Sequence, residues 1–374
     1  MTERLALLLR EESDALDVPA PDPHRILAAG RARQHRRRVL GATVAATTVL
    51  GAVGLAGITS QLLGDGSPDT YATAPELQGW AAASGSTVEL GNGRTVHVDG
   101  TVKSVYYTSA GVLVRTGRSA TTDAPDSAYT LVPDDGTTSD FSLDLGDRVP
   151  GTDPDEPYLA YAEPTGDPAR WDVVLRDVRS GQVAASVPVE GRFTWGGWVA
   201  PPVSLDGDRV YVGMDAATLV VDWRSGAVTT SDVLPPSRMP TVQGGRGVLE
   251  NRSGGSRVVD VGTGEVLLRV ADPDVIVSLA PDGRHAMALP WRTCDEDGTC
   301  TYDRPTAQVY DVDRGTHVRV DLTDASYGWT PRGDLLRVDR DSVDVCSPDT
   351  GTCRSTPVEV GGRDLRLGGT SYEA

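Results

Sequence analysis

The sequence predicts an all-β domain in which a four-stranded unit recurs, preceded by one membrane-spanning helix. Three observations carry this prediction. Between residues 76 and 374, short β-branched segments alternate with turns that contain Asp and Gly. These turns recur along the chain and share one internal pattern. Residues 39–63 contain no charged side chain, and a helix of this length crosses a hydrocarbon core of about 30 Å.

One hairpin turn recurs seven times, and a glycine marks each copy. Neighbouring marker glycines lie 36 to 51 residues apart, with a mean spacing of 43. In four copies an Asp stands four residues before the glycine. Its carboxylate accepts N–H groups of the turn, while Gly supplies a positive φ that a Cβ would oppose. The glycines are Gly93, Gly136, Gly181, Gly226, Gly264, Gly315 and Gly351, and the aspartates are Asp177, Asp222, Asp260 and Asp311.

A second turn precedes several copies, at residues 204–207, 280–283 and 330–333, and an apolar strand follows each one. One repeat therefore holds two hairpins, which make four strands, and its length is that of a β-propeller blade. We expect a β-propeller of about seven four-stranded blades over residues 76–374. Residues 364–367 are expected to supply a strand to the first blade and so close the ring. A pair of β-sandwiches is the alternative fold.

The hairpins with Asp four residues before Gly, and the Ser/Ala/Thr-x-x-Gly turns before them, resemble the repeats of WD40-like, TolB-like and quinoprotein-like bacterial propellers. The resemblance covers about four-fifths of the chain. It implies a propeller fold, here on a single-pass membrane anchor, and it implies no particular activity.

Arginines set the predicted membrane orientation. Arg36, Arg37 and Arg38 directly precede the uncharged segment, so the positive-inside rule places the N-terminus in the cytoplasm. A cleaved export signal is the alternative, because these arginines loosely resemble a twin-arginine motif. We expect a helical cytoplasmic tail (1–38), a transmembrane helix (39–63), a linker (64–75) and an extracytoplasmic propeller (76–374), which makes the protein a single-pass protein of the cell membrane.

The four cysteines all lie in the predicted outer part, which agrees with an oxidising compartment. Cys294 and Cys300 bracket one turn-rich loop, and Cys346 and Cys353 bracket another. Three pairings are possible, and two local disulfides require the fewest assumptions. A four-thiolate zinc site is the alternative, although both spacings exceed the usual two to four residues between ligands.

Signatures of catalysis are scarce in this sequence. His97, His285 and His317 fall in different repeats without metal-ligand spacing, and no G-x-S-x-G motif is present. Acidic loops such as 153–156 and 295–297 could bind Ca²⁺, but none completes an EF-hand pattern, and solvated acidic loops are the favoured interpretation. No cofactor is therefore predicted, with Ca²⁺ as the one alternative. The net charge of −18 argues against a nucleic-acid partner.

Trp195 and Trp198 flank a Gly pair in the most aromatic segment of the chain. Such a pair could contact a protein partner or a sugar. Packing between blades is the alternative, because tryptophan is usually well buried.

These features favour a non-catalytic binding module, an envelope scaffold or sensor that binds an envelope protein or glycan on a propeller face. An extracytoplasmic propeller enzyme (a hydrolase, lactonase or oxidoreductase) is one alternative. A transmembrane regulator of anti-sigma type, with a cytoplasmic regulator docked on residues 1–38, is another. The question of catalysis stays open at this stage, with the missing motifs arguing against it.

Overall fold

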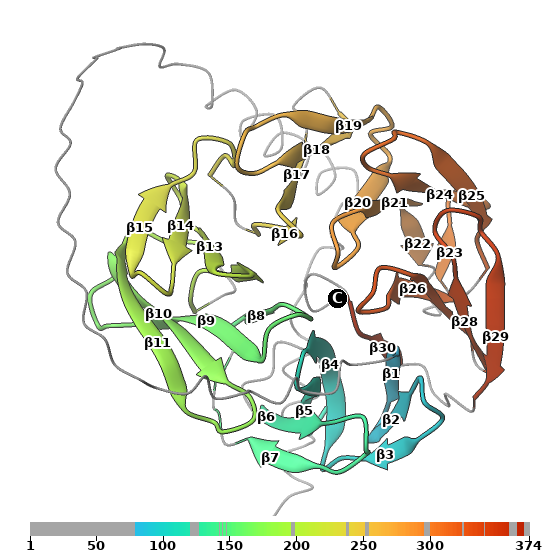
Figure 1. Cartoon of the computed structure of the whole chain (residues 1–374), viewed down its shortest axis with the longest axis horizontal. Coiled ribbons are helices and arrows are strands. Elements are labelled where there is room, and N and C mark those ends of the chain that lie inside the picture. Colours follow the sequence, from blue (N-terminus) through green and yellow to red (C-terminus); the bar gives the residue numbers. More distant parts are fainter. Residues whose placement is uncertain are drawn as a thin grey trace, which may run out of the picture. The chain divides into compact units, whose positions relative to one another are not determined.

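The computed structural model describes residues 79–369, with gaps at 120–126, 142, 144, 147, 196–198, 237–238, 251–253, 295–299, 324, 340 and 359–364. These residues form seven four-stranded antiparallel sheets, arranged as blades around a central axis (Figure 1). The predicted seven-bladed propeller is thereby confirmed, and the β-sandwich alternative is excluded.

Blades 2 to 4 take their strands in chain order from the axis outward. Blade 2 comprises β4 (Thr101–Thr108), β5 (Gly111–Gly117), β6 (Ala128–Val132) and β7 (Ser139–Phe141). Blade 3 comprises β8 (Gly151–Thr152), β9 (Tyr158–Pro164), β10 (Arg170–Asp177) and β11 (Val183–Glu190). Blade 4 comprises β12 (Val203–Asp206), β13 (Arg209–Gly213), β14 (Thr218–Asp222) and β15 (Ala227–Thr230).

Blades 5 to 7 follow the same order, and blade 6 carries an additional hairpin. Blade 5 comprises β16 (Val242–Gln243), β17 (Arg246–Glu250), β18 (Ser256–Asp260) and β19 (Val266–Val270). Blade 6 comprises β20 (Val275–Leu279), β21 (His285–Pro290), β24 (Thr306–Asp311) and β25 (His317–Asp321), and β22 (Arg292–Cys294) with β23 (Cys300–Tyr302) forms the hairpin inserted after β21. Blade 7 comprises β26 (Ser326–Trp329), β27 (Leu335–Val338), β28 (Ser342–Cys346) and β29 (Cys353–Pro357).

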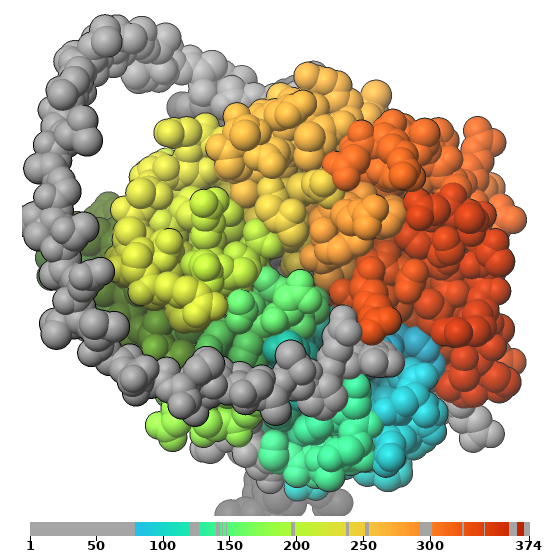
Figure 2. Space-filling model, in the orientation of Figure 1, coloured from blue at the N-terminus to red at the C-terminus, as the bar shows by residue number. Residues whose placement is uncertain are grey.

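Blade 1 joins the two ends of the propeller. Its innermost strand is β30 (Leu365–Leu367), and β1 (Ala81–Ser84), β2 (Thr87–Leu90) and β3 (Thr95–His97) follow outward. Leu367 pairs with Ala82 in the antiparallel register. The predicted closure by the C-terminal strand is confirmed, because β30 lies beside β1 (Figure 1), and the red and blue parts of the chain meet in the space-filling view (Figure 2).

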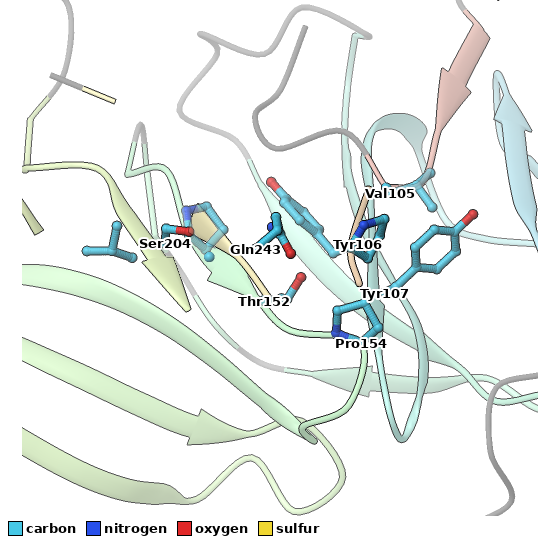
Figure 3. A pocket seen from close by; sticks show the side chains of 12 residues that line it. Val105, Tyr106, Tyr107, Thr152, Pro154, Ser204 and Gln243 are labelled. Atoms are coloured by element: carbon cyan, nitrogen blue, oxygen red, sulfur yellow. The ribbon is translucent and has the colours of Figure 1, made fainter. Parts of the chain in front are cut away.

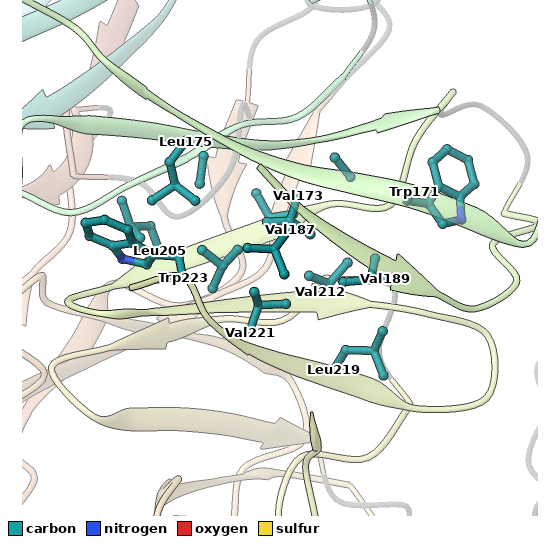
Figure 4. Close-up of a cluster of buried hydrophobic side chains, with 14 of the residues drawn as sticks. Trp171, Val173, Leu175, Val187, Val189, Leu205, Val212, Leu219, Val221 and Trp223 are labelled. Carbon is teal, nitrogen blue, oxygen red and sulfur yellow. The ribbon is translucent and has the colours of Figure 1, made fainter. Parts of the chain in front are cut away.

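The hydrophobic core of the propeller lies in the seams between blades. Seven clusters of buried side chains are present among the described residues, and each one joins two neighbouring blades. Figure 4 shows the seam between blades 3 and 4, where Val173 and Val187 of one sheet face Val212 and Val221 of the next. Inner strands such as β4 and β5 are therefore buried along nearly their whole length, whereas the outermost strand β15 is exposed along its length.

The recurrent hairpin turn has the geometry that its sequence predicts. Asp260 Oδ1 accepts the backbone N–H groups of Gly262 at 3.0 Å and Thr263 at 2.7 Å. The hydrogen bonds from Thr263 hold the pKa of Asp260 below its usual value. Gly264 closes the turn at a φ of +76°. The Asp and Gly of the repeat thus act as a pair, one accepting the turn amides and the other adopting the left-handed backbone.

Strand polarity gives the propeller two different faces. Connections between first and second strands, and between third and fourth strands, lie on one face, which we call the turn face. The remaining connections lie on the opposite face, which we call the loop face. Strand β1 begins on the turn face and β30 ends there, because Leu367 lies opposite Ala82.

Cysteine pairing agrees with the local prediction where the structure describes it. Cys346 and Cys353 form a disulfide across the turn between β28 and β29. The backbones of Cys294 and Cys300 lie directly opposite each other in the β22–β23 register. The second local disulfide remains a prediction.

The predicted tail, transmembrane helix and linker, including Arg36, Arg37 and Arg38, lie outside the described residues. Within the described part of residues 79–369, no helix has the length and apolar character needed to span a membrane.

Ring closure predicts a sensitive position at Gly368. A Cβ there would lie 2.3 Å from Cζ of the buried Tyr107, whose hydroxyl accepts the N–H of Ala81. We expect Gly368→Ala to lower the free energy of unfolding by about 1–3 kcal/mol, because the closing strand must shift. Chemical denaturation measures this, with Gly262→Ala as the control, since its Cβ would meet only Asp260 Oδ1 at 3.4 Å. Equal stability of the two variants would contradict the closure geometry.

At Gly315, backbone strain alone determines how a substitution changes the free energy of unfolding. Its φ is +66°, and a Cβ would meet no atom within 4 Å. We expect Gly315→Ala to cost about 1–2 kcal/mol of unfolding free energy, and Gly315→Asn to cost less, because Asn tolerates the left-handed region. If Ala and Asn proved equally stable in thermal or chemical denaturation, the strain argument would fail.

Candidate functional site

A small cavity lies on the propeller axis. Side chains of the innermost strands of several blades line it, among them Tyr106, Thr152, Ser204 and Gln243 (Figure 3). Its volume of about 30 Å³ holds about two water molecules, whereas small-molecule sites are typically about 300–1,000 Å³. The described residues that line it include Tyr106 and Tyr107 and no charged side chain. The axial cavity is therefore far smaller than a typical small-molecule site.

The turn face is occupied by bonds between blades. Asp153, at the first turn of blade 3, accepts the Gly207 N–H of blade 4 at 2.7 Å. Asp206 of blade 4 in turn accepts the Gly245 N–H of blade 5 at 3.0 Å. Burial raises the pKa of both carboxylates despite these bonds. The acidic loop at 153–156 thus takes part in the contact between blades 3 and 4, and Ca²⁺ binding by this loop stays an untested alternative.

The loop face carries the long connections. Turn-face connections contain two to six residues, whereas segments 191–202 and 231–241 link successive blades across the loop face. The β22–β23 hairpin projects from the same face. In repeat proteins, insertions gather on one face, which is often the binding face. The loop face is therefore the candidate functional site.

Exposed apolar side chains occur on this face. Trp291 precedes the inserted hairpin and is 51% exposed, and Ile276 at the start of β20 is 47% exposed. The register places Ile276 opposite Leu289, two residues before Trp291, so both lie at the loop-face end of blade 6. An exposed tryptophan and an exposed aliphatic side chain at the same end of one blade are typical of a recognition surface.

The base of the hairpin that follows Trp291 is braced on several sides. Arg304 forms ion pairs with Asp272 and Asp274 of the loop that enters blade 6. Asp303 donates its N–H to the Trp291 carbonyl at 3.0 Å. The Tyr302 ring packs edge-on against Tyr327 of blade 7, with the centroids 6.0 Å apart. Trp291 is consequently exposed on a fixed frame, which lowers the entropy cost of binding.

Trp195 of the predicted tryptophan pair lies on the same face but in another loop. Phe193 packs edge-on against Trp171, and Thr194 Oγ1 donates to Asp215 at 2.7 Å. Trp195 follows and is half-buried, while Trp198 lies outside the described residues. The role of Trp195 and Trp198 in partner contact stays a prediction. Sequence reasoning missed Trp291, and the long spacing between Gly264 and Gly315 was the signal that an insertion lies there.

The three outer histidines are not brought together. His97 and His317 are exposed on outermost strands, and His285 is buried at the start of β21. Within the part of the chain that the structure describes, no group of three or more His, Cys, Asp or Glu is placed to hold a metal ion.

Comparisons with known proteins found similar solved structures but no relative in sequence. No family model matches the chain, and no curated protein matches it. Apo AztD from Citrobacter koseri is similar over 79% of this chain and 99% of its own, with 12% identity and a TM-score of 0.47. Kluyveromyces lactis Hsv2 is similar over 66% and 74%, with 16% identity and a TM-score of 0.40. Kuenenia stuttgartiensis hydrazine synthase is similar over 68% and 80%, with 14% identity and a TM-score of 0.41.

The exposure of Trp291 predicts that an aqueous quencher reduces its fluorescence. Trp80, Trp171, Trp223 and Trp329 are buried and Trp195 is half-buried, so an aqueous quencher reaches Trp291 more readily than these five. In a Trp198→Phe background, we expect Trp291→Phe to remove much of the acrylamide-quenchable emission, whereas Trp171→Phe leaves it in place. Unchanged quenching in Trp291→Phe would show that this side chain is covered.

Proposed function

We propose that this chain is a membrane-anchored, extracytoplasmic β-propeller that acts as a non-catalytic binding module through its loop face. The single observation that carries the proposal is Trp291, exposed on a braced frame at the insertion of blade 6. The partner we propose is an envelope protein or glycan, and aromatic side chains serve both kinds of recognition.

The bonding of the turn face supports this use of the loop face. The turn face is occupied by bonds between blades, such as the one from the Gly207 N–H to Asp153.

A non-catalytic role also agrees with the axial cavity. Propeller enzymes need convergent polar groups around a substrate, and the cavity next to Tyr106 has no charged lining. We propose that binding energy comes from a few aromatic anchors on the loop face, as at other protein interfaces.

Crosslinking and co-purification of the full-length protein from membranes test the proposal. We expect an envelope partner, identified by mass spectrometry, whose affinity falls about 10- to 100-fold in Trp291→Ala, because a central aromatic anchor contributes roughly 2 kcal/mol or more.

Val183→Ala is the matched control, since Val183 is also exposed but lies at the turn-face end of β11. Binding that is lost equally in both variants, or crosslinks confined to the turn face, would overturn the assignment of the loop face. Partners found only on residues 1–38 would instead support the signalling alternative.

A further inference from the structure

A buried histidine sits between two carboxylates at the seam of blades 6 and 7. His285, at the start of β21, is only 7% exposed. Its Nδ1 lies 3.8 Å from Asp282 Oδ2 of the same blade, and its Nε2 lies 3.6 Å from Asp349 Oδ1 of blade 7. Nδ1 is buried without a hydrogen-bond partner among the described residues. An imidazole with one carboxylate near each nitrogen is placed to carry a positive charge.

Asp282 itself contacts blade 7. A Cβ on Gly333, in the first turn of blade 7, would lie 2.6 Å from Asp282 Oδ2. The carboxylate is therefore enclosed between its own histidine and the neighbouring blade. Although burial opposes it, His285 and the Arg284 N–H hold the pKa of Asp282 below its usual value.

Asp349 is held in position by the disulfide of blade 7. It lies in the loop that Cys346 and Cys353 close, and the Gly351 N–H donates to the Ser347 carbonyl at 2.8 Å within that loop. A cross-linked loop keeps the carboxylate close to His285 at little additional entropy cost.

The surrounding charges are mixed in sign. His285 lies opposite Asp311 in the backbone register of β21 and β24. Burial raises the pKa of Asp334 in blade 7. The other charged groups that face this cluster from both blades are Arg284, Arg314, Arg332 and Arg354. The nearest partners of the imidazole are nevertheless the two carboxylates, Asp282 and Asp349.

We propose that His285 is a pH-sensitive latch between blades 6 and 7, in which the protonated imidazole bridges Asp282 to Asp349 and its deprotonation loosens the seam. In the neutral form the two carboxylates lose the cation that lies between them, so the electrostatic attraction that joins Asp282 to Asp349 through the imidazole is lost.

The direction of the pH dependence follows from the partners. Interaction with Asp282 raises the pKa of His285 above its usual value, and burial only partly opposes this. A group whose pKa is raised on folding stabilises the protein fully below its unfolded pKa of about 6.5. That stabilisation is lost as the pH rises through the folded-state pKa. The latch is thus closed in mildly acidic conditions and opens in alkaline ones.

Histidine NMR of the full-length chain in a mild detergent tests the latch. We expect the His285 ring signal, assigned with His285→Gln, to titrate above the usual midpoint of about 6.5. Asp349→Asn should lower that midpoint, and this variant is expected to fold because the Asp349 side chain is 57% exposed. His317→Gln is the control, since His317 is exposed on β25 and should leave the His285 midpoint unchanged.

Hydrogen exchange gives the structural readout. After correction for intrinsic rates, amides of β21 and of residues 347–352 should lose protection between pH 6 and pH 8.5, and Asp349→Asn should lack this change. A His285 midpoint at or below the usual value would overturn the proposal, as would a midpoint that Asp349→Asn leaves unchanged or a seam whose protection does not vary with pH.

Discussion

Every blade of this propeller must bury both faces of its sheet, and the rest of the structure depends on that constraint. A single four-stranded sheet with Val173 and Val187 on one side has no core of its own, so the core exists only where two blades meet. Seven blades leave no free face only if the last blade meets the first. Strand β30 supplies that contact, which explains why Gly368 and Tyr107 pack without spare space at the closure.

The same constraint gives the turn face and the loop face different roles. Hydrogen bonds between the short turns of neighbouring blades keep the blades in register. In one of them, the Gly245 N–H of blade 5 donates to Asp206 of blade 4. A longer turn would break such a bond, so the turn face has little room to vary. Loop-face connections are longer, and the chain lengthens there at 191–202 and at the β22–β23 hairpin. We therefore expect recognition on the loop face, where the chain can lengthen without breaking bonds between blades.

Interactions within a short stretch or within a repeat were predictable from the sequence, whereas contacts between side chains of neighbouring blades were not. The Asp260–Gly264 turn, the closing strand and the Cys346–Cys353 bridge each depend on residues whose roles are visible in a short window or in a repeat. His285 and Asp349 stand 64 positions apart, and only the packing of blade 6 on blade 7 brings them together. Exposure of Trp291 likewise depends on what the inserted hairpin leaves uncovered.

Blade 6 connects the two features that distinguish this propeller. Strand β21 begins at His285 on the turn face and ends at Pro290, next to Trp291 on the loop face. Along its length, Met287 and Leu289 pack into the seam with blade 7, together with Tyr302 of the hairpin. A latch that loosens this seam would therefore act on the frame that fixes Trp291. The proposed pH response and the proposed binding surface share one packed layer, so protonation of His285 would favour the braced form of the loop face.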